Sequence, residues 1–180
     1  GCNVGCTHNK AIKFVTALSG RRLLLALCVT AQEEHHCSSR EEMTMKQTGQ
    51  CLCGSIKYDI TGSPNLVAVC HCRDCQRSAG APLVAWAMFP ESSVKVIAGV
   101  PKTINSSGAA MRSFCPECGT GLFYRNADVL PGLIDVQTAT LDNPNSLPPG
   151  VQVQTAERQT WVPHLGTLKA YERFPSGDEE

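Results

Sequence analysis

The sequence predicts a mainly β, single-domain protein with short helical turns. From Gly49 onward, short stretches in which polar and apolar residues alternate are separated by segments rich in glycine, proline, asparagine and serine. This is the pattern of half-buried strands joined by turns. Helical periodicity is weak throughout the chain. A length of 180 residues is enough for one domain with a hydrophobic core and hardly enough for two.

The first predicted strands follow this pattern closely. Ser55–Ile60 alternates between polar and apolar residues, as a half-buried strand does. The turn-forming segment Gly62–Asn65 separates it from Leu66–Val69, which is apolar throughout. Asp74–Ala79 could form a short turn of helix.

The middle of the chain predicts a buried strand and a hairpin. Pro82–Phe89 is rich in aliphatic and aromatic residues, which favours a buried strand, and Val94–Ile97 follows as another. Arg112–Phe114 leads into one cysteine pair and Gly121–Tyr124 leads out of it. These two segments therefore predict a strand–knuckle–strand hairpin.

The last third continues the β pattern. Leu133–Thr138 is a strand candidate, Asp142–Gly150 is a loop by composition, and Val151–Gln154 alternates again. We expect the β domain to span residues 45–175 and the polar tail 176–180 to fray.

Residues 1–44 differ from the rest, and we expect a leader that is disordered or non-native. Arg21 and Arg22 precede the short apolar run Leu23–Val29, which resembles a secretory signal. The favoured alternative is a non-native leader, with the natural start at Met43 or Met45. The apolar run is too short to span a bilayer, so no membrane association is expected.

The charge balance argues against a nucleic-acid partner. Sixteen basic residues balance sixteen acidic residues, giving a formal net charge of zero. Nucleic-acid-binding proteins usually have a basic excess, so no nucleic-acid partner is expected.

The eleven cysteines are the strongest functional signal. Their odd number and their C-x-C and C-x-x-C spacings favour metal binding in a reducing compartment over a disulfide framework. Disulfides between such close neighbours would also be strained. A cytoplasmic location is therefore expected. Seven cysteines form three tight groups: Cys51 with Cys53, Cys70 with Cys72 and Cys75, and Cys115 with Cys118.

Seven thiols are too many for one tetrahedral metal ion and one short of filling two. We therefore expect two zinc ions per chain, one structural and one catalytic. The pairs Cys51/Cys53 and Cys115/Cys118 each lie at a strand-to-turn junction, where four sulfurs can enclose a structural zinc. Such a site closes a long loop and should contribute substantially to folding.

The central group Cys70, Cys72 and Cys75 predicts a zinc ion with an open fourth position. His71 would point away from the other two side chains in an extended strand, which makes it an awkward fourth ligand. An electron-rich zinc with three thiolate ligands suits capture of a substrate thiol. Arg73 and Arg77 lie near enough in sequence to offset the negative charge.

The alternative is that the central group forms a second structural site. Asp74, His164 or another cysteine would then complete the coordination, and Arg73 and Arg77 would be solvated surface residues.

The cysteine groups, with the segments Cys70–Cys75 and Phe114–Thr120, resemble the glutathione-dependent formaldehyde-activating enzyme family, which also includes centromere protein V. The resemblance covers about Lys46 to Pro175. It implies a β-tent, zinc-ribbon-like fold. It also implies a structural zinc on Cys51, Cys53, Cys115 and Cys118 and a catalytic zinc on Cys70, Cys72 and Cys75.

The implied activity is that of a zinc-dependent carbon–sulfur lyase acting on an adduct of glutathione, or another small-molecule thiol, with formaldehyde or another aldehyde. No general acid or base is evident from the sequence. The alternative is a non-catalytic zinc module that binds a protein partner. A methionine sulfoxide reductase of related fold is disfavoured because the cysteines are committed to metal groups.

Overall fold

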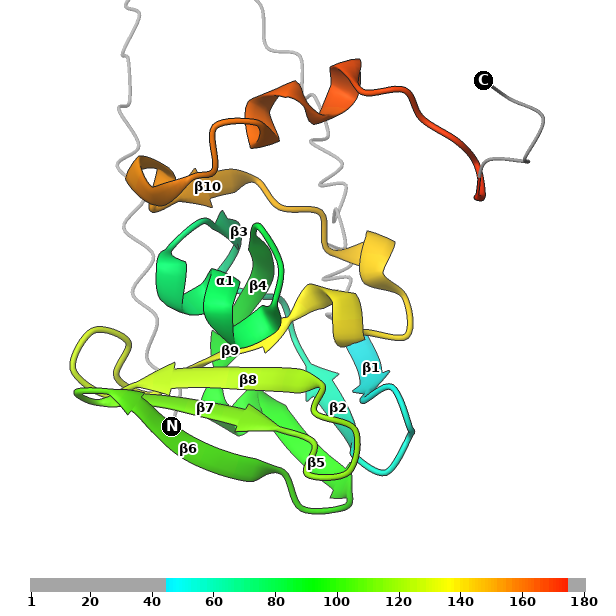
Figure 1. The fold of residues 1–180 in the computed structure, drawn as a ribbon. Helices are drawn as coiled ribbons and strands as arrows, with labels where there is room; N and C mark the ends of the chain where they lie inside the picture. The colour runs from blue at the N-terminus through cyan, green and yellow to red at the C-terminus, as the bar shows by residue number, and fades with distance from the viewer. Residues whose placement is uncertain (1–44, 175–180) are drawn as a thin grey trace, which may run out of the picture. The chain divides into compact units, whose positions relative to one another are not determined.

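The computed structural model describes residues 45–174, which form two β-sheets, one α-helix and several short 3-10 turns (Figure 1). The smaller sheet has the strand order β1-β2-β5, and the larger has the order β10-β3-β4-β9-β8-β7-β6. All these pairings are antiparallel except that of β10 with β3. The expected leader 1–44 and tail 176–180 lie outside the described residues.

The smaller sheet consists of β1 (Lys46–Gln50), β2 (Lys57–Thr61) and β5 (Val94–Ala98). The larger sheet consists of β3 (Leu66–Cys70), β4 (Val84–Pro90), β6 (Lys102–Ser107), β7 (Ala110–Phe114), β8 (Gly121–Asn126), β9 (Leu133–Gln137) and β10 (Val151–Val153). The helices are α1 (Arg73–Ala79) and the 3-10 turns η1 (Glu91–Ser93), η2 (Thr138–Thr140), η3 (Pro144–Ser146), η4 (Thr155–Glu157) and η5 (Val162–Thr167).

The main hydrophobic core lies between the two sheets. Tyr58 and Ile60 of β2 are fully buried in one cluster with Phe89, Phe123 and Val136 of the larger sheet. The rings of Tyr58 and Phe123 meet edge to face, with centroids 5.1 Å apart. Alternate residues of a strand point to opposite faces, so this core occupies one face of the larger sheet.

The other face of the larger sheet carries polar and reactive side chains. Residues opposite each other in register project to the same side. One such row crosses four strands, through Arg112, Tyr124, Asp135 and Met88. A second, smaller buried cluster contains Trp86 of β4 together with residues of β3 and α1, and α1 lies beside β3 and β4 (Figure 1). The row containing Arg112, Tyr124 and Asp135 and the main core therefore lie on opposite faces of the larger sheet.

The structure confirms the mainly β fold and the predicted short helix. Two strands, β1 and β6, were missed by the sequence analysis. Their sequences, KQTGQ and KTINSS, contain almost no apolar residues. Every residue of β6 is exposed because β6 is an edge strand. The apolar alternation that reveals a strand is absent from such a segment. Of the helices in residues 45–174, none has the length and apolar character needed to cross a membrane.

Candidate metal sites and active-site cavity

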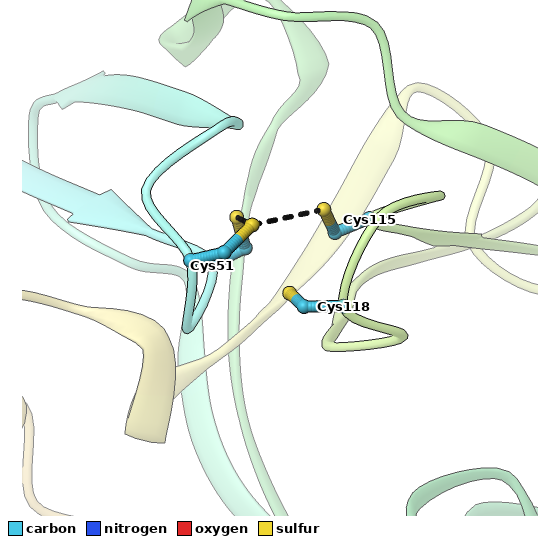
Figure 2. A group of neighbouring side chains, drawn as sticks. Cys51, Cys115 and Cys118 are labelled. Atoms are coloured by element: carbon cyan, nitrogen blue, oxygen red, sulfur yellow. Dashed lines mark hydrogen bonds between the residues drawn. The ribbon is translucent and has the colours of Figure 1, made fainter.

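Two loops bring four cysteine sulfurs together. Cys51 and Cys53 follow β1, and Cys115 and Cys118 lie between β7 and β8. All four Sγ atoms lie within 4.8 Å of one another, and Figure 2 shows the labelled cysteines turned toward a common centre. The sulfurs of Cys51 and Cys53 are 3.5 Å apart, and those of Cys53 and Cys115 are 3.8 Å apart. Tetrahedral zinc with Zn–S bonds of about 2.3 Å requires separations of about 3.8 Å, so this donor set fits zinc.

The two loops are built in the same way. In the first, the amide of Gly54 donates to the carbonyl of Cys51 (3.0 Å); in the second, Gly119 donates to Cys115 (2.9 Å). Both glycines have φ near 75°, a conformation that other residues adopt only with strain. Each turn thus folds back tightly enough to direct two sulfurs to one point.

Nearby hydrogen-bond donors lower the pKa values of two of these thiols, which favours the thiolate form that binds metal. The hydroxyl of Thr120 lies 3.2 Å from Cys118 Sγ. Hydrogen bonding from this hydroxyl, and from the backbone of Thr120 and Cys53, lowers the pKa of the Cys118 thiol to about 5. Burial opposes ionisation of Cys51, but its pKa is still lowered because the Ile56 amide donates to its sulfur (3.2 Å) and neighbouring thiols contribute. Thiolates are the form of cysteine that binds metal.

The second sulfur group forms where β3 turns into α1. Cys70 ends β3, Cys72 occupies the N-cap of α1, and Cys75 lies in the first turn. The Cys72 sulfur accepts a hydrogen bond from the Cys75 amide (3.3 Å), as a capping side chain does. The three sulfurs lie within 4.8 Å of one another. Cys70 and Cys75 are buried and Cys72 is partly exposed.

Within residues 45–174, no fourth histidine, cysteine or carboxylate joins this group. His71 is fully buried, and its Nε2 lies 3.0 Å from Gln152 Oε1. His164, expected in a loop, lies in η5 and is not part of the group. Asp74 lines the neighbouring cavity without joining the three sulfurs.

The positive charge beside this group comes from Arg112. The Arg112 guanidinium donates from Nη2 to Cys75 Sγ at 3.7 Å and lies 4.8 Å above the ring of Tyr124. Hydrogen bonding from Cys70 and the nearby Arg112 together lower the pKa of Cys75 to about 5. The side chain of Arg73, which the sequence offered for this role, instead bonds Gln76.

A cavity of about 350 Å³ opens beside the three sulfurs. Its walls are the face of the larger sheet that points away from the main core, together with α1 and the segment after β10. The residues lining it include Cys70, Cys72, Cys75, Trp86, Arg112, Tyr124 and Asp135.

Asp135 is the buried acid of this cavity. Its side chain projects from β9 on the same side as Tyr124 of β8 and Met88 of β4, and the residue is 8% exposed. Burial raises the pKa of Asp135 to about 6, and the negative charge of Cys75 adds to the shift.

A second, more open groove adjoins the cavity. It measures about 610 Å³ and shares Asp74, Trp86 and Arg112 with the cavity. Arg77 also lines it, and it extends to Gly119 at the four-cysteine loop. Charged groups of both signs therefore line a path that leads to the three sulfurs.

The seven cysteines form the two groups predicted from the sequence, whereas Arg112 and Asp135 were not predicted as site residues. A signal was present, because each is a charged residue within an otherwise half-buried strand. Burial of such a residue requires a partner or a function.

Comparison with known proteins places the chain in a family. The family model described as glutathione-dependent formaldehyde-activating enzyme matches residues 46–157, which include both cysteine groups, Arg112 and Asp135. The chain is 33% identical over 76 residues to an uncharacterized lyase of Schizosaccharomyces pombe, covering 42% of this chain and 55% of that protein. It is 33% identical over 82 residues to a Podospora anserina protein provisionally named as a glutathione-dependent formaldehyde-activating enzyme, covering 43% of this chain and 38% of that protein.

The chain thus spans about half or less of the length of these curated relatives. A crystal structure of a Rhodobacter sphaeroides protein superimposes with a TM-score of 0.48 at 22% identity, covering 59% of this chain and 99% of that one.

Proposed function

We propose that this chain, which belongs to the glutathione-dependent formaldehyde-activating enzyme family, is a zinc-dependent carbon–sulfur lyase-type enzyme. It would join a small-molecule thiol, glutathione or a similar one, to formaldehyde or another aldehyde and cleave the adduct in reverse. The observation that carries the proposal is the group of three sulfurs in the wall of a cavity that also contains a buried acid and a buried arginine.

The four-cysteine group would hold a structural zinc ion. Four sulfur ligands close the coordination sphere of zinc, so Cys51, Cys53, Cys115 and Cys118 leave no position for a substrate. The ion would join the β1–β2 loop to the β7–β8 loop and so connect the two sheets.

The three-cysteine group would hold the catalytic zinc. Cys70, Cys72 and Cys75 supply three of the four ligands that zinc prefers, which favours a catalytic site over a closed one. When bound there, zinc would supply a Lewis acid that stabilises the thiolate form of a substrate thiol.

The surrounding residues suit a charged thiol of peptide size. Arg112 offsets the negative charge of the sulfur ligands from its position beside Cys75. Trp86 and Tyr124 form apolar walls that exclude water from the reacting atoms. In the adjoining groove, Arg77 can bind a substrate carboxylate and Asp74 an ammonium group. The thiolates also suit a reducing, cytoplasmic compartment.

The proposal is tested by the rate at which glutathione exchanges with its formaldehyde adduct. Because the two combine without a catalyst, the exchange rate is measured by NMR with and without protein. We expect the protein to accelerate exchange and the Cys72→Ser variant to lose the acceleration while staying folded. Exchange no faster with the wild-type protein than in buffer would contradict the proposal and favour the non-catalytic, partner-binding alternative.

A further inference from the structure

Among the described residues, the Asp135 carboxyl group has no hydrogen-bond or ion-pair partner, unlike those of Asp59 and Asp142. Asp59 forms an ion pair with Lys46, and Asp142 accepts a hydrogen bond from Thr48. Asp135 is 8% exposed, and within residues 45–174 its carboxyl group makes neither a hydrogen bond nor an ion pair. Within residues 45–174, His71 Nδ1 is the one fully buried side-chain polar atom without a hydrogen-bond partner, so the Asp135 oxygens keep some access to the cavity. A largely buried carboxyl group whose only outlet is a cavity still requires an explanation.

The position of Asp135 in the cavity wall provides this explanation. Its carboxyl group lines the same cavity as the sulfurs of Cys70, Cys72 and Cys75. The register of β7, β8 and β9 sets Arg112, Tyr124 and Asp135 in one row on this face. Arg112, at one end of the row, reaches Cys75. Asp135, at the other end, faces the space that a substrate thiol and aldehyde would occupy.

We propose that Asp135 is the catalytic residue that exchanges protons with the substrates, an inference that rests on the proposed function. In the forward direction, the Asp135 carboxylate accepts the proton of the substrate thiol. The thiolate sulfur attacks the aldehyde carbon, a carbon–sulfur bond forms, and the carbonyl π electrons move to oxygen. Asp135 then gives the proton to that oxygen. The product is the hydroxymethyl thioether, and no net proton or electron is exchanged with solvent.

The reverse reaction uses the same group in the same starting state. The carboxylate takes the hydroxyl proton of the adduct, the carbon–sulfur bond breaks, and the proton passes to the departing sulfur. One carboxyl group therefore serves as base and then as acid in both directions.

The charged surroundings support this role. The titratable or charged groups facing the cavity are Cys70 of β3, Cys72 and Cys75 at the start of α1, Asp74 of α1, Arg112 of β7 and Tyr124 of β8. Burial raises the pKa of Asp135 above its ordinary value, toward neutrality. A group with a pKa near neutrality can both accept and release a proton at the working pH.

The test uses Asp135→Asn, which keeps the size of the side chain but cannot exchange a proton, and Asp135→Ser as a smaller second variant. Asp59→Asn is the matched control, because Asp59 lies on the smaller sheet. For each zinc-loaded protein, the zinc content, the melting temperature and the NMR exchange rate of glutathione with its formaldehyde adduct are measured. Binding of glutathione is measured separately on cobalt-substituted protein from its absorption spectrum.

We expect both Asp135 variants to keep wild-type zinc content and glutathione binding while the protein-catalysed exchange rate falls by about 100-fold or more. The Asp59→Asn control should keep the wild-type rate. A wild-type exchange rate in either folded Asp135 variant would overturn the inference and leave the proposed function intact. Loss of zinc or of thiol binding in both variants would also overturn it, since Asp135 would then be structural. A wild-type protein that does not accelerate exchange would remove the proposed function and this inference together.

Discussion

The Arg112 guanidinium lies 3.7 Å from the sulfur of Cys75, although the two residues are 37 positions apart and belong to different elements. Arg112 is also held against the ring of Tyr124 and is 9% exposed. The charge is therefore fixed beside one of three adjacent sulfurs, where it favours the thiolate form.

Replacing Arg112 by glutamine should weaken metal binding at the three-cysteine group by about tenfold at neutral pH, because protons compete better for a thiol whose pKa has risen. The loss should grow as the pH falls. Competition with a coloured zinc chelator measures the zinc affinity of the three-cysteine group in each variant. Arg125→Gln, which removes an exposed ion pair with Glu91, is the control and should leave the affinity unchanged. Equal zinc affinity in the Arg112 variant across pH 6–8 would contradict this assignment.

The two cysteine groups should differ in their effect on stability. Cys115→Ser should lower the melting temperature sharply, because it would open a four-sulfur site between two loops, where bound zinc would contribute folding free energy. Cys72→Ser should leave a folded protein with less metal at the second group. Thermal melts and zinc analysis of the two variants test the difference. Equally severe unfolding would indicate that both groups are structural.

The cysteine groups could be predicted from the sequence because their members are close neighbours in the chain. Cys70, Cys72 and Cys75 need only one strand end and one helical turn to meet. Arg112 and Asp135 could not be assigned in this way. Their contacts depend on strand order and register across the larger sheet, which one sequence does not reveal. Strand β6 was missed because an exposed edge strand needs no apolar residues.

Gly49 should be intolerant of a side chain. A Cβ atom at this position would lie 2.3 Å from the buried ring of Tyr58 and 2.6 Å from the carbonyl oxygen of Thr140. Gly49→Ala should therefore destabilise the domain by about 2 kcal/mol or more, measured by urea unfolding. Gly150→Ala is the control, because a Cβ there meets no atom within 4 Å. Similar unfolding midpoints for the two variants would show that β1 does not pack as described.

The raised pKa of Asp135 predicts a pH-dependent gain in stability on substitution. A carboxyl group whose pKa is about 6 in the folded protein, against an ordinary value of 3.8, binds protons more tightly when folded. Its ionisation therefore destabilises the fold as the pH rises from about 4 to about 6, and the full effect remains above pH 6. Asp135→Asn should be more stable than wild type by up to about 3 kcal/mol at pH 7.

The gain should disappear near pH 4, where Asp135 is largely protonated in the folded protein and the cost of burying its charge is no longer incurred. Urea unfolding of both proteins from pH 5 to pH 7, with zinc content checked at each pH, measures whether the difference shrinks as the pH falls. A constant difference across this range would mean that Asp135 does not titrate as its burial implies.

The central claim is that the three-cysteine group leaves a metal coordination position for a substrate thiol. The most direct measurement is the absorption spectrum of the cobalt-substituted protein during titration with glutathione, with S-methylglutathione as the control that has no thiol to ionise. The spectrum should change on addition of glutathione, more strongly as the pH rises and the thiol ionises, and much less with the S-methyl compound. A spectrum that glutathione leaves unchanged across this pH range would contradict the claim and show that the site is closed.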